Sequence, residues 1–151
     1  EGALYLIGEA HKKLKQWDEA LAHCERRVRV RLAHHGEGGA KRVARVAEAY
    51  RDIGVVYRQG RGDYERALEN YMKAVPVAEE ATGKLSKTTG LLCAKTSVGY
   101  RNQQRYAEAV PWYERAVAAY TFTFGAENEQ YTKTVVGYLE DAKQQAAQQQ
   151  Q

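Results

Sequence analysis

Apolar and small residues recur along the chain at positions i, i+3, i+4 and i+7, the spacing that places side chains on one face of a helix. Three segments carry this pattern in register, each centred on an alanine: Ala20, Ala67 and Ala109. Four residues after each alanine stand, in order, Cys24, Tyr71 and Tyr113. The alanines are 47 and 42 residues apart, so the pattern predicts one helical element used three times.

A second amphipathic segment precedes each of these helices and carries a small residue: Gly8, Gly54 or Ser97. A small residue allows a neighbouring helix to approach closely. The pattern predicts helix pairs over residues 2–15 with 17–35, 40–59 with 63–82, and 87–103 with 106–123, followed by a final helix over 128–147. One helix pair cannot bury its own apolar face, so we expect the pairs to stack.

This arrangement resembles the tetratricopeptide repeat (TPR) family over nearly the whole chain. The 42-residue step and the string YAEAVPWYERAV over residues 106–117 are similar to the long repeats of kinesin light chains. Gly83 and Gly125 fit the same type, since they lie 17 residues before Tyr100 and Ala142. The resemblance implies an all-α fold: a right-handed α-α superhelix, or TPR solenoid, of about three helix pairs plus a C-terminal helix.

The chain of 151 residues is expected to form a single TPR domain over residues 1–143. Its repeats are predicted at about 1–36, 40–83 and 86–125, with the C-terminal helix at about 128–147 and a Gln-rich tail over 144–151. The final helix looks like the first helix of a fourth repeat whose second helix is absent. Either it caps the stack or a parent chain continues, and the start at Glu1 without a methionine also predicts a fragment.

Composition narrows the class of protein. No apolar run approaches the roughly 18–20 residues that a membrane-spanning helix needs. The two cysteines are too few for a disulfide framework and favour a reducing compartment, so we expect an intracellular, cytoplasmic protein, with a cytoskeletal or ciliary setting as one option.

Positive charge is concentrated in residues 26–45, although the net charge of the chain is only +4. This basic patch has one acidic residue, Glu37, and seven basic ones: Arg26, Arg27, Arg29, Arg31, Lys41, Arg42 and Arg45. It is either a solvated helix face with a loop, or a contact for an acidic protein segment, a phosphate or nucleic acid. Arg27 occupies the position of Ala74 and Ala116 in the other repeats, where a guanidinium misfits unless it reaches water or a carboxylate.

The TPR resemblance also implies that first helices line a concave, peptide-binding groove. Transferred position by position, the groove residues are Tyr5, Glu9, Lys12, Lys13, Arg51, Val55, Arg58, Gln59, Ala94, Val98, Arg101 and Asn102, with Lys133, Val136, Glu140 and Lys143 from the last helix. Seven of these sixteen are basic and two are acidic, which favours an acidic segment with micromolar affinity. The asparagines usual in kinesin-light-chain repeats and the carboxylate clamp of chaperone-binding TPRs are both missing, so neither ligand class is predicted.

No catalytic constellation is present in the sequence, and we predict that the chain is not an enzyme. His23 and Cys24 are adjacent and therefore point about 100° apart on a helix. His34 and His35 have no matching metal ligands, and the glycines near residues 36–39 and 60–62 do not follow strands as nucleotide-binding loops do. No metal, cofactor, small-molecule substrate or membrane partner is predicted.

Three functions are consistent with the sequence. The leading interpretation is an adaptor or scaffold module that docks an acidic or amphipathic protein segment in its groove. The second is a structural segment of a larger cytoskeletal, ciliary or motor-associated assembly, held by lateral contacts. The third, and weakest, is nucleic-acid binding through residues 26–45.

Overall fold

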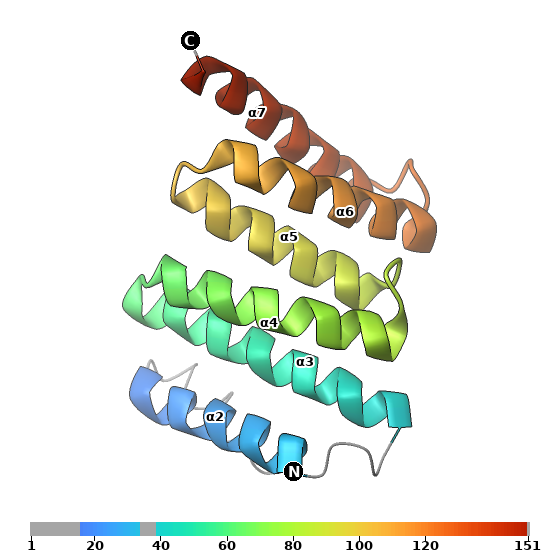
Figure 1. Cartoon of the computed structure of the whole chain (residues 1–151). Coiled ribbons are helices and arrows are strands. Elements are labelled where there is room, and N and C mark those ends of the chain that lie inside the picture. Colours follow the sequence, from blue (N-terminus) through green and yellow to red (C-terminus); the bar gives the residue numbers. More distant parts are fainter. Residues whose placement is uncertain (1–15, 34–38, 151) are drawn as a thin grey trace. The chain divides into compact units, whose positions relative to one another are not determined.

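A computed structural model describes residues 16–33 and 39–150 of the chain (Figure 1). This part consists of helices and turns and contains no strand, so the predicted all-α class is confirmed. The predicted helix over 2–15, with Gly8 and the groove residues Tyr5, Glu9, Lys12 and Lys13, lies outside the described residues. The chain divides into two compact units, residues 1–81 and 82–151.

The N-terminal unit contains α2 (Trp17–Ala33), α3 (Gly39–Val56), a π-helical turn η1 (Tyr57–Arg61) and α4 (Tyr64–Thr82). Helices α2 and α3 pack along each other through a core of small and branched side chains. The core residues are Ala20, Leu21, Cys24, Val28, Ala49, Ile53 and Val56, flanked by Trp17, Tyr50 and Tyr57. Ala20 and Cys24, which the helical pattern placed on one face of the second helix, are therefore buried in the interface with α3.

Helices α3 and α4 meet where Gly54 faces Tyr71. A Cβ atom built on Gly54 would lie 2.5 Å from Tyr71 Cε1 and 3.0 Å from the carbonyl oxygen of Ala67. Real Cβ atoms do not approach ring carbons so closely, so only glycine allows this spacing. Gly54, the small residue of this first helix, therefore allows the neighbouring helix to approach closely, as the sequence predicted.

The predicted helix over 40–59 ends differently in the structure. Helix α3 stops at Val56, and the chain continues through the wider turn η1 to Arg61. That turn brings Gly60 directly against the Trp17 ring, where a Cβ atom would collide with the indole. Gly62 then adopts φ +62, a left-handed conformation that suits glycine, and Asp63 accepts a hydrogen bond from Arg66 N at 3.0 Å to start α4.

The C-terminal unit contains α5 (Lys87–Asn102), α6 (Tyr106–Phe124), a π-helical turn η2 (Glu129–Lys133) and α7 (Thr134–Gln149). Helix α6 packs against both α5 and α7, and the three run side by side in Figure 1. Tyr120 of α6 lies over Gly90 of α5, whose Cβ atom would be 2.8 Å from Tyr120 Cε1. The ring also contacts Phe124 and Tyr131, with centroids 5.9 Å and 5.5 Å away.

Two loops of this unit have similar geometry, with their glycines and capping residues 42 residues apart and their threonines 43 residues apart. Gly83 and Gly125 both adopt φ +87. Thr89 Oγ1 donates to the carbonyl of Gly83 at 2.8 Å, and Thr132 Oγ1 donates to that of Gly125 at 2.8 Å. Each first turn is capped by a side-chain oxygen, which belongs to Ser86 in one loop and to Asn128 in the other. The spacing read from the sequence is therefore a repeat of structure as well.

Alkaline stability tests the burial of Tyr120. Burial raises the pKa of Tyr120 from its ordinary 10.0 to about 12. Between about pH 10 and pH 12 the unfolded chain therefore releases this proton while the folded chain keeps it. We expect the unfolding free energy to fall by about 2–3 kcal/mol over this range on account of this residue. The measurement is urea unfolding at a series of pH values.

The variant Tyr120→Phe should show a shallower fall between pH 10 and pH 12 than the natural chain. Tyr64→Phe is the matched control, because Tyr64 is 39% exposed, and it should leave the slope unchanged. An identical fall in the natural chain and in Tyr120→Phe would contradict the burial of this hydroxyl.

Candidate interaction surfaces

The arginine that the repeat pattern marked as a misfit is paired with a buried carboxylate. Arg27 is 3% exposed, and its Nη1 donates to Asp52 Oδ2 of α3 at 2.7 Å. Asp52, also 3% exposed, accepts two further bonds at Oδ1, from Arg51 Nε at 3.2 Å and Arg51 Nη2 at 2.9 Å. The sequence left two options for Arg27, exposure to water or pairing with a carboxylate, and the structure shows the pairing with a carboxylate.

The predicted basic patch is smaller than its sequence suggests. Besides Arg27, Arg31 is buried at 5% exposure and donates to the carbonyl of Arg45. Both side chains bind within the N-terminal unit, so neither belongs to an exposed patch. The patch residues that remain exposed in the described structure are Arg26, Arg29, Lys41 and Arg45; the side chain of Arg42 lies outside the description.

The predicted groove residues of α3 and η1 differ in what they contact. Arg51 is half-buried and binds Asp52. Val55 is half-buried, and Gln59 is exposed within η1. Arg58, also half-buried, lies beside the buried Tyr71 of α4, where its positive charge opposes the rise that burial causes in the tyrosine's pKa.

The predicted groove residues of α5 show the same arrangement in the C-terminal unit. Arg101 is half-buried and lies near Tyr113 of α6, whose pKa burial raises and the arginine's charge lowers. Arg101 corresponds to Arg58, and Tyr113 to Tyr71, in the register read from the sequence. An arginine beside the buried tyrosine of its own repeat therefore occurs in both units. Ala94 and Val98 are half-buried, and Asn102 is exposed.

One contributor to this surface was missed in the sequence. Tyr138 of α7 is 42% exposed, and the Arg101 guanidinium lies over its ring, 4.8 Å from the centroid. Within the C-terminal unit this contact joins the two predicted first helices, α5 and α7. Tyr138 stands two residues after Val136, the transferred position, and only the inter-helix geometry shows that it reaches Arg101.

Two predicted basic groove residues of the last helix are already engaged by carboxylates. Lys133 Nζ lies 2.8 Å from Glu129 Oε1 and 3.0 Å from Glu127 Oε2, and hydrogen bonding to Glu129 raises the pKa of Lys133. Lys143 Nζ lies 2.9 Å from Glu114 Oε1 of α6. By contrast, Arg58 and Arg101 form no ion pair within residues 16–33 and 39–150, and both are half-buried.

The described residues bring no metal-binding cluster together. Over residues 16–33 and 39–150, no group of three or more His, Cys, Asp or Glu side chains is placed to hold an ion. Cys24 and Cys93 are buried in the helix interfaces and form no disulfide, and the loop with His34 and His35 lies outside the description. No helix in this same part of the chain is long and apolar enough to cross a bilayer.

The sequence matches known repeats in two places. Sequence models described as tetratricopeptide repeat match residues 1–80 and residues 97–129. Among curated proteins, "Protein KINESIN LIGHT CHAIN-RELATED 2" of Arabidopsis thaliana is 30% identical over 117 residues. The aligned part covers 76% of this chain but 16% of that relative, so the chain corresponds to a small part of it.

Removing one partner of the buried pair should be costly. Asp52→Ala leaves Arg27 buried without this carboxylate, and we expect a loss of about 3–5 kcal/mol in unfolding free energy. The double variant Arg27→Met with Asp52→Leu removes both charges and should recover most of that loss. Urea unfolding of the single and double variants measures the difference. A loss in Asp52→Ala below about 1 kcal/mol, or a double variant as unstable as the single one, would contradict the pairing.

Proposed function

Because the chain belongs to the tetratricopeptide repeat family, we propose that it is an interaction module that binds an acidic or amphipathic protein segment along its first-helix faces. The family match and the helix pairs confirm the predicted fold class, an all-α TPR solenoid, and the likeness to kinesin light chains. The family is one of non-enzymatic repeat scaffolds that bind proteins. The nature of the segment and the absence of catalysis in this chain belong to the proposal.

The observation that carries the proposal is the Arg101–Tyr138 contact in the C-terminal unit. Contact with an aromatic face does not use the N–H donors of a guanidinium, and these donors match a carboxylate in geometry and charge. Holding Arg101 in place also reduces the conformational entropy that it loses when a ligand binds. The contact therefore supports recognition of an acidic side chain at a defined position.

Apolar anchors accompany this charge. Val98 lies one turn before Arg101 on α5 and is half-buried, and Tyr138 leaves 42% of its surface accessible. An exposed charge pair alone contributes only about 0–1 kcal/mol, so the apolar contacts have to supply much of the affinity. A segment in which acidic residues alternate with apolar ones supplies both the charged contact and the apolar contacts.

The segment formed by α3 and η1 supports the same chemistry in the N-terminal unit. Arg58 lies beside Tyr71, and Val55 is the neighbouring half-buried apolar residue. Arg51 contributes less to ligand binding, because Asp52 already accepts two of its hydrogen bonds. Arg58 and Arg101 are therefore the principal basic contacts in the proposal, and Arg51 orients Asp52.

The nucleic-acid hypothesis gains no support from the surface. With Arg27 and Arg31 buried, residues 26–45 offer fewer exposed positive charges than the sequence suggested. The structural-segment hypothesis stays a prediction, since a relative's name describes that relative alone.

Replacing Arg101 should weaken peptide binding without unfolding the chain. The probe is a short labelled peptide in which leucines alternate with pairs of glutamates, titrated by fluorescence anisotropy. We expect micromolar affinity for the natural chain and an affinity about five-fold weaker for Arg101→Ala. The unfolding free energy of the variant should fall by less than about 1 kcal/mol, since an accessible cation–π contact contributes no more than this.

Lys84→Ala is the matched control, because Lys84 is an exposed cation of the same unit, in the turn before α5 and outside the predicted groove positions. It should bind the acidic peptide like the natural chain. A peptide with lysines in place of the glutamates should bind weakly. Equal affinity for the two peptides, or unchanged binding by Arg101→Ala, would refute the proposed recognition.

A further inference from the structure

The outward face of α6 carries a stripe of exposed apolar residues. Its members follow one another at helical spacing along most of the helix: Ala107, Pro111, Ala118 and Phe122. At 100° per residue they lie within about 60° of one another, on the side of α6 opposite the buried Tyr113. Phe122 is 74% exposed, more than any other large hydrophobic residue of the described chain. A continuous apolar stripe of this kind is typical of a contact surface.

The repeat itself does not require this stripe. Helix α4 has the same length as α6, and its equivalent positions, 42 residues earlier, are exposed and mostly acidic: Glu65, Glu69, Pro76 and Glu80. None of these three glutamates forms an ion pair within residues 16–33 and 39–150. Because the fold accepts glutamates at these positions, packing within one unit does not explain the apolar residues of α6. A contact with another molecule does.

The charged side chains beside the stripe are engaged within the C-terminal unit. Each has a partner close by: Arg105 Nε donates to Glu108 Oε2 at 2.6 Å, Lys143 Nζ lies 2.9 Å from Glu114 Oε1, and the Arg115 guanidinium lies 4.6 Å from the centroid of the Trp112 ring. A contact between two identical surfaces brings like charges together, which opposes the contact unless those charges are engaged within their own copy. The outward face of α6 meets this condition.

The two ends of the stripe differ in size and fit each other. The C-terminal end carries the large Phe122, and the N-terminal end carries the small Ala107 and the compact ring of Pro111. When two α6 helices pack antiparallel about a twofold axis, Phe122 of one copy can lie at the height of Ala107 of the other. In that register Phe122 enters the space beside Ala107 and Pro111, in the way that a side chain of one helix packs between side chains of the next.

We propose that the apolar stripe of α6 docks against the same stripe of a second copy of this chain, with the two helices antiparallel. Phe122 of each copy packs on Ala107 and Pro111 of the other, and Pro111 lies opposite Ala118. The stripe is about 22 Å long at 1.5 Å per residue, so the contact is short. An interface of this size is smaller than that of stable dimers, and we expect a dissociation constant on the order of 10–100 µM.

The stripe is separate from the surface of the proposed function. The acidic segment is proposed to bind α5 and α7, where Arg101 lies over Tyr138. Arg101 acts on the buried Tyr113 of α6, and the stripe lies on the opposite side of that helix. Arg101→Ala should therefore leave self-association unchanged, and the failures of the two proposals are distinguishable.

Sedimentation equilibrium of the natural chain, from about 5 to about 500 µM, tests the dimer. Phe122→Glu introduces the residue type of the equivalent α4 position and should weaken self-association at least about ten-fold. Ala118→Glu, at another position of the stripe, should have the same effect. Circular dichroism should show that both variants fold like the natural chain, because both side chains are exposed.

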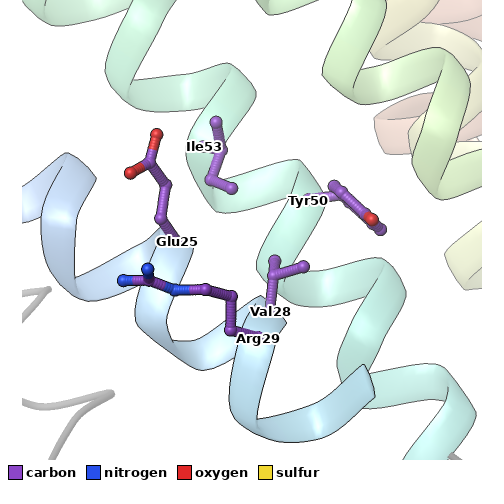
Figure 2. A pocket seen from close by; sticks show the side chains of 5 residues that line it. All are labelled: Glu25, Val28, Arg29, Tyr50 and Ile53. Carbon is purple, nitrogen blue, oxygen red and sulfur yellow. The ribbon is translucent and has the colours of Figure 1, made fainter. Parts of the chain in front are cut away.

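Leu32→Glu is the matched control in the N-terminal unit. Leu32 is 44% exposed and follows Val28 by one turn of α2. Val28, Tyr50 and Ile53 line a pocket of about 290 Å³ between α2 and α3 (Figure 2). A dimer held through that apolar surface would be weakened by Leu32→Glu and not by Phe122→Glu. We expect Leu32→Glu to associate like the natural chain.

Engineered disulfides test the antiparallel register. A mixture of Pro111→Cys and Ala118→Cys chains should form a cross-linked dimer under mild oxidation, because the two positions face each other. Either variant alone should cross-link at least about five-fold more slowly, since identical positions are about 10 Å apart along the helix axis. Cys24 and Cys93 are buried and should not compete.

Four outcomes would overturn the proposal. They are a natural chain that stays monomeric over the whole concentration range, self-association that Phe122→Glu and Ala118→Glu leave unchanged, weakening by Leu32→Glu as large as by Phe122→Glu, and single-cysteine variants that cross-link as fast as the mixture.

Discussion

A tyrosine ring packed against a position with little or no side chain holds the helix pairs of this protein together. In the N-terminal unit Tyr71 lies against Gly54, at a distance that excludes a Cβ atom. In the C-terminal unit Tyr120 lies against Gly90 in the same manner. Close approach brings the helix backbones near enough for their small seam residues to exclude water, and this burial is the main stabilising contribution in a fold without strands.

The position of the surface charges follows from this packing. Because Tyr71 and Tyr113 are buried against the first helix of their own repeat, the arginine one turn further along that helix lies beside the ring in both units. The repeat therefore sets both the core and the spacing of cations on the first-helix faces. Departures from the repeat have equally local causes: Arg27 replaces an alanine, and Asp52 of α3 compensates its charge.

The sequence predicts helix positions well because periodicity is a property of each segment alone. The bounds of α4, α5 and α6 agree with the predicted ranges to within one residue at each end, and the 42-residue step recurs in the loops at Gly83 and Gly125. Contacts between helices are harder to predict, since they depend on how far one helix is rotated and shifted against the next. The partner of Arg27, the contact of Tyr138 with Arg101 and the pocket beside Val28 all depend on that relative placement.

The most direct test of the packing account compares two glycine-to-alanine changes within helices. Gly54 has Tyr71 and Ala67 against it, whereas nothing lies within 4 Å of a Cβ atom built on Gly137 of α7. Alanine should raise the unfolding free energy by about 0.5–1 kcal/mol at position 137, through helix propensity. At position 54 the collision should outweigh that gain and lower the unfolding free energy by roughly 1–2 kcal/mol. Urea unfolding followed by circular dichroism measures both. If Gly54→Ala stabilises the chain as much as Gly137→Ala does, the close approach of Tyr71 is not what holds the pair together.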